Sequence, residues 1–410
     1  MKQFLEESKK ISREIATLSG ATKNKVLNEM ADALIEHCDF IVSCNQKDMS
    51  AGRLAPLDDA LLDRLLLTGD RVKDMADAIK EIATLKEPVG RNLDGWVTEN
   101  GLNIQKVSIP IGVIGIIYES RPNVTSDTAA LCFKSGNVCV LKGGKEAEHS
   151  NKAIANVLRS VLAKNKLPEQ AIALLPDSTR DGVANLIKQD KYVDLIVPRG
   201  GEALIKYVSE NSSVPVVKHD KGLCHVYIDK DANHEKAIQI AINAKVQRPG
   251  VCNAMETLLV HKEVAAYILP PLHEAYQRYG TELKGCDQSK KFIDIQCATQ
   301  EDYDTEYLAN ILSIKVVENV EDAIHHISKF GSGHSEAIIS ENYSIVNRFL
   351  NEVDAACVYA NASTRFTDGG AFGLGAEVGI STNKLHSRGP MGINDLTTFK
   401  YKIYGQGQIR

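Results

Sequence analysis

The spacing of apolar residues changes character along the chain and divides it into parts. In residues 1–90, apolar side chains recur every three to four positions between Lys and Glu, a period typical of amphipathic helices. Helices are predicted there at residues 2–18, 23–38 and 60–85. Residues 96–108 instead alternate between apolar and polar around Gly101, which predicts a β-hairpin.

From residue 113 onward, short apolar runs alternate with helical patterns. A first group of strands is predicted at residues 113–118, 138–141, 171–175, 193–197, 214–217 and 224–228. A second group is predicted at residues 258–261, 292–295, 313–317, 336–339 and 356–359, and the alternating tail 396–409 predicts one more strand. Strands that alternate with helices indicate parallel sheets wound on both faces, in which ligands bind at the carboxyl ends of the strands.

Composition and charge exclude several classes of function. The 410 residues are 43% hydrophobic and 25% charged, with a net charge of −5, as in ordinary globular proteins. Because no basic stripe with interleaved aromatic residues is present, nucleic acid is not an expected partner. No apolar run reaches the roughly 18 residues that a membrane span needs, and the charged N-terminus lacks the apolar centre of a signal peptide.

The cysteines argue against a disulfide or metal framework. They number nine, and the sequence contains neither a C-x-x-C spacing nor an H-x-x-x-H motif. Scattered reduced thiols suit a cytoplasmic protein, and no metal site is expected.

One cysteine, Cys252, lies where a chemical role is conceivable. A helical pattern over residues 235–245 is broken by Pro249 and Gly250, and an apolar run begins at residue 258. Nearby cations, here Lys245 and Arg248, favour the thiolate, which is the nucleophilic form. The alternative is an inert packed thiol, the commoner state of a single cysteine.

Two glycine-containing loops each connect a predicted strand to a predicted helix. They read Lys142-Gly-Gly-Lys145 and Pro198-Arg199-Gly200-Gly201. Glycine lets the backbone approach a phosphate, and the start of the next helix favours anions. Each loop alone could be a plain turn, but two in one sheet point to a nucleotide site.

Polar clusters follow other strands. Asn123, after the strand at 113–118, could donate its amide to an oxyanion, or it could be a turn residue after Pro122. Residues 361–368 carry several hydroxyls and Arg365, which could bind an amino-acid carboxylate, or they form an ordinary polar loop. His334 lies in a Gly- and Ser-rich loop and is either catalytic or a polar helix-end residue.

These pieces resemble the aldehyde dehydrogenase superfamily in their order. The segments at 108–125, 247–253, 330–336 and 361–370 are similar to its glutamate-5-semialdehyde dehydrogenase family, whose members are also called γ-glutamyl phosphate reductases, and the resemblance spans nearly the whole chain. It implies two doubly wound α/β domains with a projecting hairpin and a C-terminal strand. The expected parts are a cofactor-binding domain of residues 1–93 and 110–243, a catalytic domain of residues 244–384, and an oligomerisation hairpin and tail of residues 94–109 and 385–410.

The resemblance also implies a reaction. That family reduces L-glutamyl 5-phosphate with NADPH to glutamate 5-semialdehyde in proline biosynthesis. Cys252 would form a thioester, and Asn123 and the Cys252 backbone N–H would stabilise the oxyanion. Cofactor-binding residues are expected at Lys142, Lys145, Arg199, Gly200, Gly201 and Glu306. Substrate-binding residues are expected at Arg121, Asn361, Ser363, Thr364 and Arg365.

Two departures from the superfamily sharpen this expectation. Hydrolytic members carry a glutamate about 33 residues before the nucleophile, and that place falls here on His219, in a segment without Glu. An enzyme that passes its thioester to hydride and phosphate needs no base to activate water. Where many members have a glutamate for the ribose hydroxyls, this chain has Lys145, which would attract the 2′-phosphate of NADPH.

Alternatives stay open at this point. The chain could be an NAD-dependent hydrolytic aldehyde dehydrogenase acting on a small semialdehyde, or a catalytically silent protein that kept the fold. The N-terminal part contains no kinase-like region, so a glutamate 5-kinase partner would be a separate chain. The hairpin and the tail suggest a homo-oligomer.

Overall fold

The computed structural model describes residues 1–55, 57, 59–217 and 221–410, which form two compact units. Unit 1 comprises Met1–Lys218, Gly373–Gly379 and Met391–Arg410, and unit 2 comprises His219–Phe372 and Ile380–Pro390. Within the described ranges, no helix is both long and apolar enough to cross a membrane, and no cluster of His, Cys, Asp and Glu side chains could hold a metal ion.

Unit 1 begins with a set of helices. Their bounds are α1 (Lys2–Ile15), α2 (Gly20–Glu36), α3 (Cys38–Leu54), α4 (Asp59–Leu65) and α5 (Gly69–Thr84). The prediction of a single helix over residues 60–85 is wrong, because the structure has two helices there, α4 and α5. The Thr68 side chain accepts a hydrogen bond from the backbone N–H of Arg71 and caps a new helix there.

A four-stranded parallel sheet forms the centre of unit 1, in the order β5-β4-β3-β6. Its elements are β3 (Val113–Tyr118), α6 (Asn123–Lys134), β4 (Val138–Gly143), α7 (Glu148–Lys164), β5 (Ile172–Leu174), α8 (Arg180–Leu186), β6 (Leu195–Arg199) and α9 (Glu202–Asn211). Strands β3 and β4 are buried at every position, as expected for central strands covered on both faces. The strand predicted at 214–217 is reduced to one bridge, between Ile196 and Val216.

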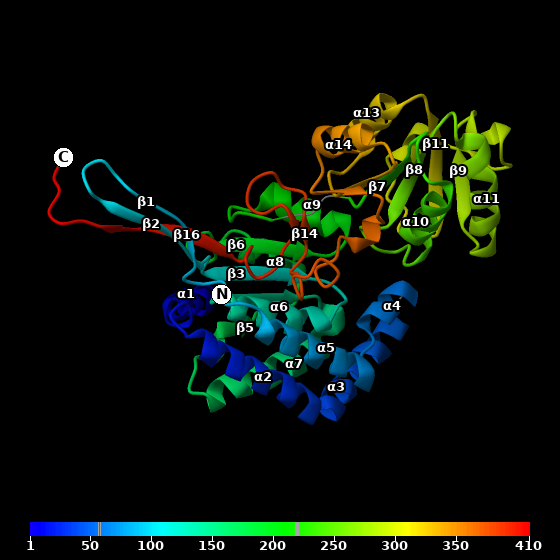
Figure 1. Ribbon diagram of the computed structural model, residues 1–410. Coiled ribbons are helices and arrows are strands. Elements are labelled where there is room, and N and C mark those ends of the chain that lie inside the picture. Colours follow the sequence, from blue (N-terminus) through cyan, green and yellow to red (C-terminus); the bar gives the residue numbers. More distant parts are fainter. Residues whose placement is uncertain (56, 58, 218–220) are drawn as a thin grey trace. The chain divides into compact units, whose positions relative to one another are not determined.

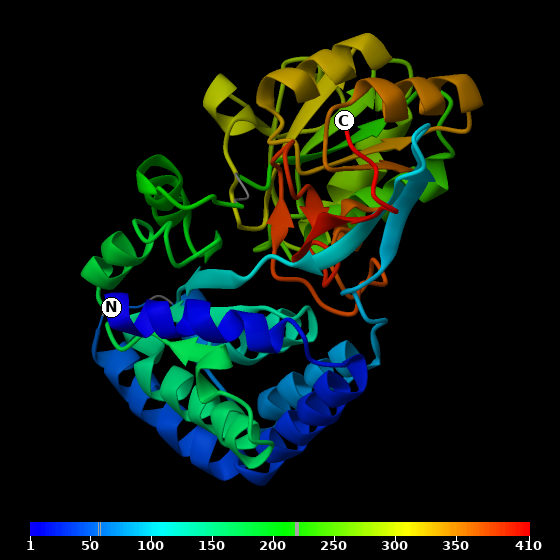
Figure 2. The same cartoon turned by 90° about the vertical axis from the view of Figure 1, so that its left-hand side faces the viewer.

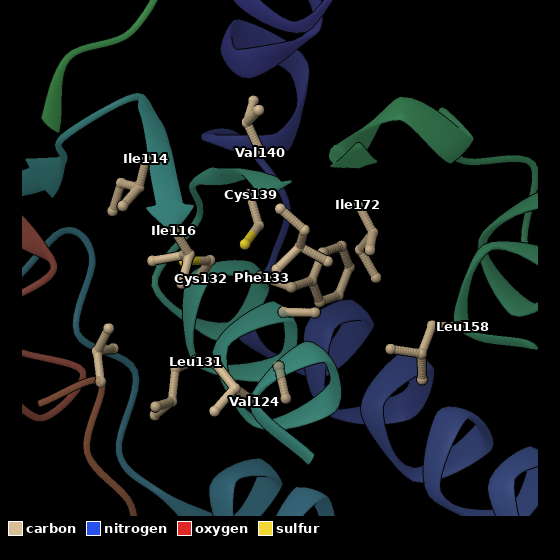
Figure 3. Packing of buried hydrophobic residues seen from close by; sticks show 14 of the residues in the cluster. Ile114, Ile116, Val124, Leu131, Cys132, Phe133, Cys139, Val140, Leu158 and Ile172 are labelled. Atoms are coloured by element: carbon tan, nitrogen blue, oxygen red, sulfur yellow. The ribbon is translucent and has the colours of Figure 1, made fainter. Parts of the chain in front are cut away.

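Helix α6 lies between this sheet and the first helices (Figure 1). Its residues Cys132 and Phe133 pack toward Cys139 of β4 and Ile116 of β3, with Leu158 of α7 nearby (Figure 3). This continuous apolar core holds the strand ends that carry the two glycine loops in fixed places.

A separate three-stranded antiparallel sheet extends away from the rest of unit 1 (Figures 1 and 2). It consists of β1 (Asn92–Val97), β2 (Asn103–Pro110) and β16 (Thr397–Tyr404), in the order β1-β2-β16. The predicted hairpin and terminal strand are confirmed, and Gly101 provides the positive φ of 85° that the turn requires.

Unit 2 is built on a seven-stranded parallel sheet in the order β10-β9-β11-β8-β7-β12-β13. Its strands are β7 (Cys224–Ile228), β8 (Met255–His261), β9 (Glu282–Gly285), β10 (Gln296–Cys297), β11 (Ile311–Val317), β12 (Ser335–Ile339) and β13 (Cys357–Ala360). Its helices are α10 (His234–Val246), α11 (Ala265–Arg278), α12 (Gln300–Tyr303), α13 (Val320–Phe330) and α14 (Tyr343–Glu352). The short strands β14 (Ile380–Ser381) and β15 (Gly389–Pro390) pair with each other.

The two faces of the unit 2 sheet are covered by different helices (Figure 1). Val226 and Ile228 face the core formed with α10 and α11, while Tyr227 between them faces α13 and α14. This is the doubly wound arrangement that the alternating pattern predicts, and the α/β fold class with parallel sheets is confirmed.

Two segments differ from their predicted places. Strand β7 and helix α10, which precede the predicted boundary at 243/244, belong to the unit of the second sheet, because β7 pairs with β8 and β12. The strand predicted at 292–295 is wrong, because this segment is a loop that follows the 3-10 helix Ser289–Lys291. Its apolar residue Ile293 is buried, although it does not belong to a strand.

Candidate active site

Cys252 lies in the loop between α10 and β8, as the broken helical pattern predicts. Its side chain is half-buried, whereas Cys224 and Cys357 in the same unit are buried. The loop therefore leaves this thiol partly open to a reactant while its backbone is enclosed.

The backbone of Cys252 is enclosed by the chain that leads into β7. A Cβ atom added to Gly222 would lie 2.4 Å from the Cα of Cys252 and 2.2 Å from its carbonyl oxygen. Two residues further on, the Cys224 thiol donates to that same carbonyl oxygen at 3.2 Å. Only glycine at position 222 allows this approach.

Replacing Gly222 with alanine should displace the Cys252 backbone, because those separations are impossible for a real Cβ. A misplacement of about 1 Å costs on the order of 100-fold in rate, and we expect kcat/KM to fall by about that factor. Steady-state kinetics check this. The matched control is Gly250→Ala in the same loop, where the added Cβ would meet only the Leu308 carbonyl at 3.4 Å. Equal activities of the two variants would contradict the account.

On its other side the nucleophile loop is fixed by the segment after β13. The Thr364 hydroxyl donates to the Asn253 carbonyl at 2.8 Å, and the Asn253 amide donates to the Thr367 carbonyl at 2.6 Å. Asn253 follows Cys252 directly, so these two bonds fix the chain at the nucleophile.

Behind this contact, buried hydroxyls continue the hydrogen-bond network. The Thr367 hydroxyl lies 2.6 Å from the Ser335 hydroxyl and 2.7 Å from that of Tyr359. The fully buried His334 ring nitrogen Nδ1 lies 2.9 Å from the Ser335 hydroxyl and 3.7 Å from the Cys224 sulfur. His334 is thus part of the support of the loop rather than of an exposed polar turn.

A buried ion pair joins the two ends of the nucleophile loop. Lys245, at the end of α10, donates to Glu256 in β8 at 2.7 Å, and both side chains are 0% exposed. Burial raises the pKa of Glu256, and the Lys245 charge opposes that rise. Sequence reasoning noted Lys245 only as a nearby charge and missed Glu256, which has no motif to mark it.

Arg365 contacts the beginning of the same loop. Its Nε donates to the Gln247 side-chain oxygen at 2.8 Å. Burial lowers the pKa of Arg365, the neighbouring Arg248 charge lowers it further, and Asp368 and Cys252 oppose both effects. Arg365 therefore lies near Cys252, with the Arg248 guanidinium as its cationic neighbour.

The other predicted substrate residues differ in what they contact. The Asn361 side-chain oxygen accepts a hydrogen bond from the Ser340 backbone N–H at 3.0 Å, and its amide nitrogen donates to the Ser340 carbonyl at 2.9 Å. This side chain therefore anchors the chain at the end of β12. Ser363 caps the short 3-10 helix at Thr364–Phe366. Half-buried Glu306 is close enough to the Lys245–Glu256 pair to influence both pKa values. His219, which occupies the place of the glutamate found in hydrolytic members of the superfamily, lies outside the described residues.

Unit 1 carries the two glycine loops at the ends of β4 and β6. The amine of Lys142 is buried and donates to the Ser178 carbonyl at 2.8 Å, and burial lowers its pKa. Lys145 is exposed. The backbone N–H of Gly201 donates to Glu119 at 3.1 Å, and a Cβ on Gly201 would meet no atom within 4 Å. The second loop thus has open space above it at the start of α9.

Asn123 and Arg121 lie between β3 and α6. Asn123 is the first residue of α6, and its amide donates to Asp127 at 3.0 Å. Burial raises the pKa of Asp127 to about 6, against the hydrogen bonds from Asn123 and Ser126. Arg121 is half-buried. The oxyanion role of Asn123 stays a prediction.

The predicted residues fall into the two units. Arg121, Asn123, Lys142, Lys145, Arg199, Gly200 and Gly201 belong to unit 1, and Cys252, Glu306, Asn361, Ser363, Thr364 and Arg365 belong to unit 2. Gly222, Glu256 and Arg248 are the neighbours of Cys252 that no motif assigned as site residues. A glycine between a basic segment and a strand, as at Gly222, is too common in sequences to identify a site residue by itself.

Known proteins are similar to this chain in both sequence and fold. The model of the aldehyde dehydrogenase family matches residues 1–288. A gamma-glutamyl phosphate reductase of Aliarcobacter butzleri is 71% identical over 410 residues, and one of Sulfurovum sp. is 68% identical, each with 100% of both chains covered. The crystal structure of gamma-glutamyl phosphate reductase from Thermotoga maritima has a TM-score of 0.97 at 44% identity, covering 100% of this chain and 99% of that chain.

Proposed function

The chain belongs to the aldehyde dehydrogenase family and, within it, to the γ-glutamyl phosphate reductases, and from this premise we propose that Cys252 is its acylated nucleophile and NADPH its reductant. The enzyme reduces L-glutamyl 5-phosphate, a small molecule, to L-glutamate 5-semialdehyde in proline biosynthesis. Members of the wider family use a nicotinamide cofactor. The observation that carries the proposal is the half-buried Cys252 thiol on a loop fixed on both sides.

In the first step the Cys252 thiolate attacks the acyl carbon of the substrate. The carbon–sulfur bond forms, the carbon–oxygen bond to phosphate breaks, and phosphate leaves with the electron pair. Arg248 and Arg365 favour the thiolate by their charge. The enclosed backbone of Cys252 keeps the sulfur in one place, which reduces the entropic cost of reaching the attack geometry.

When bound, the nicotinamide cofactor supplies a hydride to the thioester carbon. The Cys252 backbone N–H is the proposed donor to the negative oxygen of each tetrahedral species, and the second donor predicted from the sequence is the Asn123 amide. Collapse of the second species releases the aldehyde and restores the Cys252 thiolate.

The unit 1 loops offer a site that fits such a cofactor. The open space above Gly201 and the start of the ten-residue helix α9 suit a phosphate group. Lys142 and Arg199 border the same strand ends, and the exposed Lys145 would meet a 2′-phosphate. Glu306 is the proposed contact for the nicotinamide ribose.

The reverse reaction tests the proposed function. The enzyme is given glutamate 5-semialdehyde and NADP, with and without inorganic phosphate or arsenate. Turnover that requires either anion is expected, because phosphate must attack the thioester. Phosphate-independent turnover would instead identify a hydrolytic dehydrogenase, and absent turnover a silent protein.

Replacing Lys145 with glutamate should weaken the preference for NADPH over NADH. The lysine attracts a 2′-phosphate and the glutamate repels it, so the ratio of kcat/KM for NADPH over NADH should fall by about 10- to 100-fold, which corresponds to roughly 1.4–3 kcal/mol. Lys188→Glu, at another exposed lysine of unit 1, is the control. An unchanged ratio in the Lys145 variant would refute this assignment.

The three-stranded sheet of unit 1 is the proposed oligomer contact. All six residues of the edge strand β1 are exposed, and Trp96 and Tyr401 are 44% and 51% exposed. Exposed aromatic residues beside an edge strand favour pairing with a second copy.

The acyl phosphate would come from a glutamate 5-kinase on a separate chain.

A further inference from the structure

Two guanidinium groups belong to or contact the nucleophile loop, and the reaction derived so far uses only their charge, which favours the thiolate. Arg248 belongs to the loop itself, four residues before Cys252. Arg365 comes from the segment after β13, and its Nε bonds the side chain of Gln247, the neighbour of Arg248. Arginine presents a planar fork of N–H groups that matches the oxygens of a phosphate.

The position of Arg365 relative to Cys252 is fixed from both ends of the loop. One end is the Arg365–Gln247 bond at 2.8 Å. The other is the bond from the Thr364 hydroxyl to the Asn253 carbonyl, also at 2.8 Å. Because residues 247 and 253 flank Cys252, the Arg365 guanidinium is tied to the loop on one side of the sulfur, and its chain neighbour Thr364 is tied to it on the other.

The charges around this arrangement are unbalanced. The Arg248 and Arg365 cations repel each other, which contributes to the lowered pKa of Arg365. The nearby Asp368 carboxylate already accepts from the backbone N–H groups of Gly370 and Ala371, at 3.1 and 3.2 Å. A doubly charged anion bound between the two arginines would relieve this repulsion.

We propose that Arg248 and Arg365 bind the phosphoryl group of the acyl phosphate and hold it as phosphate when it leaves. The inference rests on the proposed function and names the subsite for its leaving group. It reassigns Arg365, which the sequence suggested as a partner for the α-carboxylate.

The chemistry of the substrate favours the phosphate over the carboxylate. The phosphoryl group is attached to the carbon that Cys252 attacks, whereas the α-carboxylate is at the opposite end of the molecule. Negative charge also moves from the sulfur to the departing phosphate oxygen during the attack. A cationic pair at the nucleophile loop therefore stabilises the thiolate before this step and the phosphate after it.

The test measures the KM for each substrate of the reverse reaction separately. In Arg248→Ala and Arg365→Ala, the KM for inorganic phosphate should rise about 10- to 100-fold, as expected for a lost charge-assisted hydrogen bond. The KM for the semialdehyde should change by less than about threefold. Arg278→Ala, at the end of α11, is the control. A raised KM for the semialdehyde with an unchanged KM for phosphate would overturn the proposal.

A second measurement does not depend on turnover. In the wild-type enzyme without cofactor, inorganic phosphate should slow alkylation of Cys252 by iodoacetamide, and this protection should be lost in both variants. Arg365→Lys retains the charge without the fork and should keep part of the protection, which covers the case that Arg365→Ala does not fold. Protection that persists in all variants would contradict the subsite. A wild-type enzyme that turns over without phosphate would instead defeat the proposed function.

Discussion

Cys252→Ala should reduce phosphate-dependent turnover by about 10⁴- to 10⁶-fold, the range expected when a covalent nucleophile is removed. The fold should be retained, because the bonds to the Cys252 carbonyl and to and from Asn253 that hold this loop remain in the variant. We therefore expect the thermal midpoint to shift by no more than a few degrees. Stopped assays at high enzyme concentration measure the residual rate, and a thermal melt measures the fold.

The matched control for that variant is Cys297→Ala. Cys297 is an exposed thiol on β10, in the same unit. Its variant should keep wild-type kinetics and lose only one reactive thiol. Near-wild-type turnover in Cys252→Ala, or a comparable loss in Cys297→Ala, would remove the assignment of the nucleophile.

Lys245→Met should be the most destabilising single change near the site. It leaves the Glu256 carboxylate buried without its cation, and breaking a buried pair in this way costs about 3–5 kcal/mol. Chemical denaturation at pH 8 measures the loss. Lys262→Met is the control, because its partner Glu318 forms an exposed pair, with both side chains about half exposed, and should be worth at most about 1 kcal/mol.

The loss in Lys245→Met should also depend on pH. Without its cation, the buried Glu256 carboxyl keeps a pKa above that of the unfolded chain. The folded variant then holds a proton that the unfolded chain releases, so its stability falls as the pH rises through the interval between the two values. The deficit should accordingly be smaller at pH 5 than at pH 8. The double variant Lys245→Met/Glu256→Gln should recover most of the loss, and a failure of both effects would show that the pair is unimportant.

Much of the fold could be predicted because its periodic signals are local. The fully buried strand β3 and the exposed alternation of the hairpin around Gly101 both follow from neighbouring residues alone. The errors occurred where distant contacts decide the structure. Strand β7 looks like one more strand of the first group, yet its partners β8 and β12 assign it to the second sheet.

The candidate site shows the same division. Cys252 and the two glycine loops could be located from motifs, because each motif lies within one short segment. The supporting contacts could not, since they join segments far apart in the sequence. Gly222 matters only because the backbone of Cys252 passes next to it, and the partner of Lys245 becomes visible only when α10 and β8 lie side by side.

The central claim is that the acyl group of the substrate is carried on Cys252. The most direct test incubates the enzyme with glutamate 5-semialdehyde and NADP without phosphate, stops the reaction in acid and maps the modified peptide by mass spectrometry. We predict a glutamyl thioester on Cys252, which inorganic phosphate discharges when it is added before the acid. A glutamyl group on another residue, or an unmodified Cys252 in an enzyme that has produced NADPH, would contradict the account.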